Sequence, residues 1–160
     1  MEDAVVSAVT DDTSEAKVTV TGVPDHPGVA ARLFRVLSDR GVNVDMIVQN
    51  TSEKGLTDIS FTVALTDREV ALSTCESIRE ELGAAKVTAD AGIGRVTLVG
   101  AGMKSHPGVT AMMFETLAAR GINIEMISTS SIRISCVVRA ERVEEAVIAL
   151  HSAFGLDTVS

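Results

Sequence analysis

The sequence predicts an α+β fold built from two copies of one βαββαβ module, and three observations lead to this prediction. Residues 26–47 are repeated at 106–127, with twelve of 22 positions identical. Apolar residues alternate with period two in some segments and recur every three or four positions in others. The length of 160 residues suffices for two small modules. We therefore expect a first module over residues 15–91 and a second over 92–160.

The first strand and first helix of each copy can be predicted from local pattern. Apolar runs at 18–23 and 96–99 end in glycine- and proline-containing loops, as expected for a buried strand that leads into a turn. His-Pro-Gly then opens an amphipathic helix with proline in its first turn. An arginine and a glycine, at 40–41 and 120–121, end each helix. The predicted core positions of these helices are Val29, Leu33, Leu37, Val109, Met113 and Leu117.

Two further strands and a second helix follow in each copy. Period-two alternation predicts strands over 42–49, 59–63, 122–126 and 132–136. Second helices are predicted over 67–82 and 140–154, with acidic residues near their positive ends. We expect their buried faces to consist of Val70, Ala71, Thr74, Cys75, Ile78 and Leu82 in the first copy and Val143, Ala146, Val147, Leu150 and Phe154 in the second.

The last strand of the second copy is missing from its expected place. The first copy closes with a strand at 85–90, whereas the corresponding 156–160 is too short. Residues 4–10 read as a strand that has no partner in the first copy, so we predict that they complete the second module. The order βαββαβ indicates a ferredoxin-like module, with an antiparallel sheet and two helices on one face. Its exposed sheet edges favour pairing of modules and of chains.

Composition and charge exclude several classes of function. The formal net charge is −8, and the chain has neither Trp nor Tyr, which disfavours nucleic acid and anionic membranes as partners. Two distant cysteines give neither a disulfide framework nor a zinc-ligand pair, which suits a reducing cytosol. The chain starts without a signal-peptide pattern and lacks an apolar run of membrane-spanning length. These features predict a cytoplasmic protein.

The residues that usually carry catalysis have structural explanations here. The glycine-rich 100–105 lacks the GK[ST] of a phosphate loop, and Ser105 stands where a dinucleotide pattern has glycine. His26 and His106 precede prolines without a nearby nucleophile, so we interpret them as capping or loop residues. Cys75 and Cys136 fall on predicted core faces and are expected to act as small hydrophobes. We therefore predict no catalytic residue, no metal and no cofactor.

The joint between the first strand and the first helix is the best candidate for a binding site. Free amides at a helix N-terminus can hold a carboxylate, and Asp25 adds a negative charge beside them. Together they could hold the carboxylate and ammonium of a free amino acid, with further polar groups on the second strands. The alternative is that Asp25 caps the helix and Asn123 makes a turn contact.

Longer stretches of the chain resemble one known family. GVPDHPGVAARLF (from Gly22), VNVDMIVQN (from Val42), TDISFTV (from Thr57) and VGAGMKSHPGV with NIEMISTSSIRIS (from Val99 and Asn123) are similar to the paired ACT domains at the carboxy-terminal end of aspartate kinases. In that family an amino-terminal kinase domain phosphorylates L-aspartate with ATP. Nothing in these 160 residues resembles that domain. The resemblance therefore implies a regulatory chain that is no enzyme on its own, forms a homodimer and pairs with a full-length catalytic subunit.

The resemblance also implies two effector sites, each formed where one ACT module meets the other kind of module of a second chain. It assigns to the first site Asp25, His26, Pro27, Gly28, Val29, Ala30 and Gln49, closed by Asn123 and Ile124 of the second chain. It assigns to the related site Asn43, Val44, Asp45, Thr110, Ala111, Ser130 and Ser131. L-Threonine is the expected occupant of the first site and L-lysine, in enzymes of concerted inhibition, of the second. Because Ser105 replaces Asp25 in the second copy, the sites cannot be chemically equal.

Three other classes compete with this interpretation. An ACT regulatory subunit of another pathway, such as the small subunit of acetolactate synthase, would bind valine instead of threonine. A nucleotide-sensing or metal-carrying ferredoxin-like protein would need basic phosphate ligands or a CxxC pair in the first loop, and neither is present. A free-standing enzyme would need a catalytic constellation that the sequence lacks.

Overall fold

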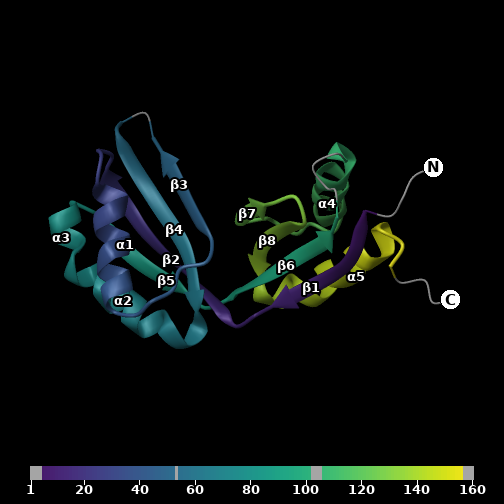
Figure 1. The fold of residues 1–160 in the computed structure, drawn as a ribbon, viewed down its shortest axis with the longest axis horizontal. Coiled ribbons are helices and arrows are strands. Elements are labelled where there is room, and N and C mark those ends of the chain that lie inside the picture. Colours follow the sequence, from purple (N-terminus) through teal and green to yellow (C-terminus); the bar gives the residue numbers. More distant parts are fainter. Residues whose placement is uncertain (1–4, 53, 102–105, 157–160) are drawn as a thin grey trace. The chain divides into compact units, whose positions relative to one another are not determined.

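A computed structural model describes residues 5–52, 54–101 and 106–156. The chain divides into two compact units, one formed by Ser14–Ala91 and the other by the residues up to Thr13 together with those from Gly92 onward. We call them module 1 and module 2. Each contains a four-stranded antiparallel sheet covered by helices (Figure 1), so the predicted α+β class with two βαββαβ units is confirmed. No helix in the described part of the chain is both long and apolar enough to cross a membrane.

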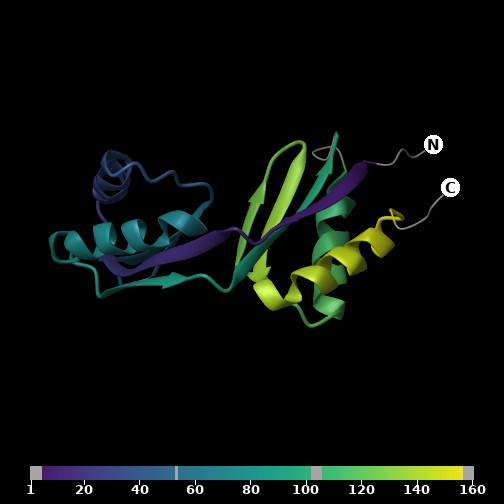
Figure 2. The same cartoon turned by 90° about the horizontal axis from the view of Figure 1, so that it is seen from below.

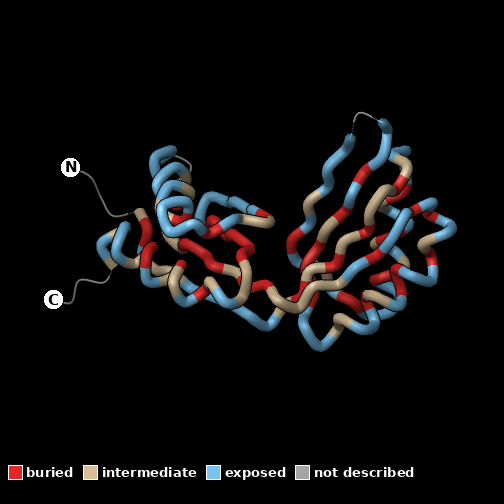
Figure 3. Tube along the Cα trace, turned by 180° about the vertical axis from the view of Figure 1, so that it is seen from behind, coloured by how far each residue is buried: buried red, intermediate tan, exposed pale blue. Residues whose placement is uncertain are grey.

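Module 1 follows the order βαββαβ. Its elements are β2 (Glu15–Pro24), α1 (Val29–Asp39), β3 (Ile47–Thr51), β4 (Leu56–Ala64), the 3-10 turn η1 (Leu65–Asp67), α2 (Arg68–Ser77), α3 (Arg79–Leu82) and β5 (Lys86–Asp90). The sheet order is β3-β4-β2-β5. Buried residues alternate with less buried ones along β2 as far as Val20 and along β4 as far as Phe61, and Figure 3 colours the buried positions red. The apolar ones pack against the predicted positions Val29, Leu33 and Leu37 of α1.

Module 2 repeats this arrangement, but its fourth strand comes from the amino-terminal segment. Its elements are β1 (Val6–Asp12), β6 (Ile93–Gly100), α4 (Pro107–Ala119), β7 (Met126–Thr129), β8 (Arg133–Arg139), the 3-10 turn η3 (Ala140–Arg142) and α5 (Val143–Ala153). The sheet order is β1-β6-β8-β7. Strand β1 runs antiparallel to β6, with Thr10 opposite Thr97, and the two lie side by side in Figures 1 and 2. Module 1 is thus inserted between two neighbouring strands of module 2.

The second strands begin later than the alternation predicts. Strand β3 starts at Ile47 and β7 at Met126, and not at residues 42 and 122. The amides of Val42 and Ile122 instead donate to the carbonyl oxygens of Leu37 and Leu117, at 3.0 Å in both modules. These residues close the preceding helix and are buried, so they cannot also pair as a strand.

The second helix of module 1 also differs from the prediction. Val70 is 39% exposed and does not belong to the buried face. Ala71, Thr74 and Cys75 form that face because they repeat at three- and four-residue intervals, whereas Val70 lies about 100° away from Ala71. The helix is interrupted at Ile78, which separates α2 from α3.

Candidate effector-binding site

The joint between β2 and α1 is an uncapped helix N-terminus. Gly28 is the N-cap residue and has φ 93°, a conformation that favours glycine, and no side chain caps the helix. The amide of Arg32 donates to the Gly28 oxygen at 2.9 Å. The Val29 amide makes a long contact of 3.4 Å with the His26 oxygen. The Ala30 amide belongs to the first turn, where intrahelical acceptors are lacking and the helix dipole favours an anion. Pro27 precedes the helix, and so it is not in the first turn as predicted.

Asp25 lies beside this N-terminus without capping it. Its amide donates to the Gly55 oxygen at 2.8 Å, which attaches the loop to the β3–β4 hairpin. Because α1 has no side-chain cap, the alternative explanation of Asp25 as a cap is wrong. His26 does not cap the helix either, since its Nδ1 atom lies 3.3 Å from the Pro27 oxygen within its own loop. Asp25 and His26 are both exposed.

Gln49 lies at the same end of module 1, on the helix-covered side of the sheet. It pairs with Ile59, which pairs with Val20. Directly paired residues of antiparallel strands point to the same face, and Ile59 and Val20 belong to the core beneath α1. Gln49 is exposed because β3 is an edge strand. The structure thus brings Gln49 toward the end of the sheet from which the Asp25 loop leads into α1.

The segment after each first helix lies at the opposite end of its sheet. In module 1 the amide of Asp45 donates to the Thr62 oxygen at 3.0 Å, far along β4 from the Gly55 turn that contacts Asp25. Asn43 is exposed and Val44 is half-buried. Asn123 and Ile124 occupy the corresponding positions in module 2. In the described ranges Asn123 makes no hydrogen bond, so the turn contact suggested as an alternative is wrong.

The remaining residues of the related site lie in module 2. Thr110 and Ala111 are in the first two turns of α4, which begins after His106 without a side-chain cap. The predicted Ser105 lies outside the described residues. Ser130 and Ser131 form the turn between β7 and β8. The Ser130 hydroxyl oxygen accepts hydrogen bonds from the amides of Ile132 and Arg133 at 3.3 and 3.1 Å. This role in stabilising the turn was not predicted from the sequence.

Two hollows of the surface were not predicted from the sequence. One, of about 350 Å³, lies at the β2 bulge, where the Gly22 amide donates to Asp58 Oδ1 at 2.8 Å. Its lining residues are Thr21, Gly22, Asn50, Thr51, Ser52, Leu56 and Asp58. Asp58 follows Thr57 and precedes Ile59, so it points away from the helices. The polar residues that flank the β3–β4 turn were the available sequence signal for this hollow.

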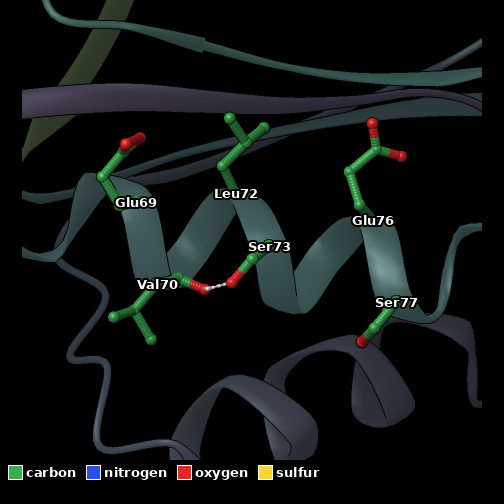
Figure 4. Close-up of a pocket in the computed structure, with 6 residues that line it drawn as sticks. All are labelled: Glu69, Val70, Leu72, Ser73, Glu76 and Ser77. Atoms are coloured by element: carbon green, nitrogen blue, oxygen red, sulfur yellow. Dashed lines mark hydrogen bonds between the residues drawn. The ribbon is translucent and has the colours of Figure 1, made fainter.

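The second hollow is a groove along α2. It is lined by Glu69, Val70, Leu72, Ser73, Glu76 and Ser77. Figure 4 shows that Leu72 and Glu76 point to one side of the helix and Val70 and Ser77 to the other. The only hydrogen bond drawn joins Ser73 to the Val70 oxygen, one helical turn back, at 3.2 Å. These side chains diverge, so they do not form a chemical site.

Both cysteines are structural. Cys75 and Cys136 are buried, and burial raises the pKa of each thiol to about 12. A thiol that stays protonated at neutral pH is a poor nucleophile. Among the residues described, no group of His, Cys, Asp and Glu side chains could hold a metal ion. The joint at α1 therefore remains the site with the clearest binding chemistry.

Comparison with known proteins identifies the class of both modules. ACT-domain models match residues 17–83 and 96–154. The chain is 52% identical over 158 residues to the aspartokinase of Mycobacterium tuberculosis, covering 98% of this chain and 38% of that protein. The crystal structure of the ligand-free regulatory subunit of aspartate kinase from Thermus thermophilus matches with a TM-score of 0.89 and 39% identity, covering 94% of this chain and 99% of that one.

A crystal structure of aspartokinase alpha and beta subunits matches equally well, with a TM-score of 0.89, 42% identity, and coverage of 94% of this chain and 99% of the matched one. The chain belongs to the aspartate kinase family, and it matches the tandem ACT regulatory region of that family. The resemblance found in the sequence is confirmed. The chain spans 38% of the length of the curated aspartokinases it matches.

Proposed function

We propose that this chain is the allosteric regulatory part of a cytoplasmic aspartate kinase, and that it binds L-threonine for feedback inhibition. In the holoenzyme the kinase transfers a phosphoryl group from ATP to L-aspartate, and this chain supplies no catalytic residue. The observation that carries the proposal is the uncapped N-terminus of α1 beside the exposed Asp25. Its relatives include a regulatory subunit of aspartate kinase over nearly the whole chain.

The joint fits the chemistry of a small polar amino acid. The ligand carboxylate binds the Ala30 amide and replaces the His26 oxygen, 3.4 Å away, as the acceptor of the Val29 amide. The helix dipole is favourable at this position. The ammonium group pairs with the Asp25 carboxylate, and the Gln49 amide hydrogen-bonds the threonine hydroxyl. That last contact distinguishes threonine from valine, because valine leaves a polar group of the site unpaired.

A second copy of the chain completes the site. Strands β3 and β7 are sheet edges, and the equivalent residues Ile47 and Ile127 on them are 53% and 43% exposed. Exposed edge strands favour pairing with another chain. In the proposed homodimer, Asn123 and Ile124 of one copy close the α1 site of the other. The related site holds L-lysine at the other set of residues assigned above.

Inhibition then follows from linkage. Threonine that contacts two copies binds the assembled regulatory dimer better than separate chains, so its binding free energy favours assembly. If the dimer also favours an inactive arrangement of the catalytic subunit, threonine lowers activity by the same coupling free energy. The full-length catalytic subunit is the partner in which this effect is measured.

Calorimetric titration with threonine tests this proposal, with valine and lysine as further ligands. Asp25→Ala should weaken threonine binding about tenfold or more, because it removes a charge-assisted contact. Asp39→Ala is the matched control: it removes the same charge from the opposite end of α1, where the carboxylate lies 3.8 Å from Arg35. Unchanged threonine affinity in Asp25→Ala, or a preference for valine in the wild type, would overturn the assignment.

A further inference from the structure

The segment 121–125 of module 2 is fixed by backbone hydrogen bonds near both ends but not in its middle. The Ile122 amide donates to the Leu117 oxygen at 3.0 Å, and the Glu125 amide donates to the Val137 oxygen at 2.8 Å. Between them, Asn123 and Ile124 neither donate nor accept a hydrogen bond within the described ranges. Their backbone groups are therefore available to another molecule.

Arg142 fixes the amino-terminal side of this segment. Its guanidinium donates to the Arg120 oxygen at 2.7 Å and to the Gly121 oxygen at 3.3 Å. These carbonyls end α4, where a cation is favoured by the unpaired oxygens and the helix dipole. The guanidinium is itself oriented by Glu145, at 3.0 and 3.1 Å.

Arg139 fixes the carboxyl-terminal side. Its Nε donates to Glu125 Oε2 at 2.8 Å, and its second nitrogen lies 3.4 Å from Glu125 Oε1. This two-point contact suits the planar guanidinium and restrains the carboxylate. The two side chains are 38% and 22% exposed, so solvent screens the pair only in part. Glu125 is thus held by both its backbone and its side chain.

Module 1 lacks both arginines at the corresponding positions. The Asp45 amide donates to the Thr62 oxygen in module 1, and the Glu125 amide donates to the Val137 oxygen in module 2. Thr62 and Val137 are therefore equivalent positions. Ala64 then corresponds to Arg139 and Asp67 to Arg142. Neither residue carries a guanidinium that could hold the segment 43–45 in the same way.

We propose that Arg139 and Arg142 are positioning residues that hold Asn123 and Ile124 in the conformation that closes the threonine site of a second copy. This inference rests on the proposed function and deepens it. A segment that is already ordered loses less conformational freedom on binding, so the ligand binds more tightly.

The test compares Arg139→Gln, Arg142→Gln and the conservative Arg142→Lys with wild type. Threonine affinity is measured by calorimetry, and exchange of the Ile122 and Glu125 amides is measured without ligand. We expect each Gln variant to bind threonine roughly two- to twelvefold more weakly, the range set by the ordering cost of one side chain. The same variants should exchange these amides faster. Arg142→Lys should be intermediate, because an ammonium cannot span two carbonyls as a guanidinium does.

The matched control is Arg79→Gln in module 1. Arg79 contacts Glu76 at 3.1 Å and the Ala84 oxygen at 3.4 Å, and its 37% exposure is close to that of Arg139. We expect no change in threonine affinity for this variant. A double variant of Arg139→Gln with Glu125→Gln should bind threonine no more weakly than Arg139→Gln alone.

The outcomes separate this inference from the proposed function. If wild type binds threonine and the Gln variants bind it equally well, the positioning role is wrong and the proposed function stands. If wild type binds no threonine, the proposed function fails, and unchanged amide exchange in the Gln variants would overturn the positioning role as well. Equal loss of affinity in Arg79→Gln would show a nonspecific effect of charge and would also refute it.

Discussion

Gly94 in β6 is the position where one added methyl group should matter most. A Cβ at residue 94 would lie 2.3 Å from Val143 Cγ2, 3.2 Å from Thr13 Cγ2 and 3.6 Å from the Asp12 oxygen. Carbon atoms in contact normally stay about 3.5–4.0 Å apart. Gly94 is buried, and the branched Val143 has little freedom to rotate away within its helix. Gly94→Ala should therefore push α5 away from the β1–β6 strand pair.

The expected cost follows from this clash. Overpacking of a well-packed core costs about 1–3 kcal/mol, and the 2.3 Å approach favours the upper half of that range. For a module of this size, each kcal/mol lowers the melting temperature by roughly 4–8 °C. Thermal and urea unfolding measure the change. Gly108→Ala is the control within the same module, because a Cβ there meets nothing within 4 Å and alanine suits a helix better than glycine by up to about 1 kcal/mol.

A double-mutant cycle decides whether the contact is the cause. Val143→Ala alone should cost about 1–2 kcal/mol through lost burial. In that background the cost of Gly94→Ala should fall by about 1 kcal/mol or more, since the clashing methyl group is gone. If Gly94→Ala leaves the free energy of unfolding unchanged, or lowers it equally in both backgrounds, the contact with Val143 is not the cause.

Two further predictions concern buried polar atoms. Burial raises the pKa of Cys75 and Cys136 from 9.0 to about 12, so the thiols ionise at lower pH in the unfolded state than in the folded state. Their contribution to stability is fully present below pH 9 and is lost as the pH rises toward 12, so the urea midpoint should fall in that window. Iodoacetamide at pH 8 should react with them only on unfolding. Ser135→Ala removes the partner of the buried Thr97 hydroxyl at 2.8 Å and should cost about 1–2 kcal/mol by urea unfolding. Ser60→Ala breaks the analogous, less buried contact at 2.9 Å and should cost less; equal costs would contradict the role of burial.

The helix faces could be predicted from the sequence because they depend on local periodicity. Leu33, Leu37, Met113 and Leu117 were expected in the core, and all four are fully buried. The start of the second strand could not be predicted, because Val42 fits a strand pattern but its amide closes α1. Apolar alternation indicates which residues are buried, whereas hydrogen bonding decides whether they pair.

The candidate site was predictable only in its local part. The loop at Asp25 and the helix that follows it are adjacent in sequence, so their joint could be recognised. The placement of Gln49 depends on its register with Ile59, which no local pattern specifies. The contacts of Arg139 with Glu125 and of Arg142 with the end of α4 were missed because these partners lie 14 and about 22 residues away, and half-buried arginines give no periodic signal.

The insertion of module 1 between β1 and β6 affects how the chain can fold as it leaves the ribosome. Ser7 donates to the Val99 oxygen across 92 positions of sequence, so β1 is synthesised long before its partner strand. Until then the hydrogen-bonding edge of β1 is unpaired and its apolar side chains are exposed, including Val6, which is 4% exposed in the native state. Both can associate with other chains. Folding of module 1 in the interval would bring the two strand ends together and reduce the entropy cost of closing that loop. Folded module 1 would then help β1 and β6 to pair in module 2. Variants that slow the folding of module 1 should therefore raise the aggregation of nascent chains.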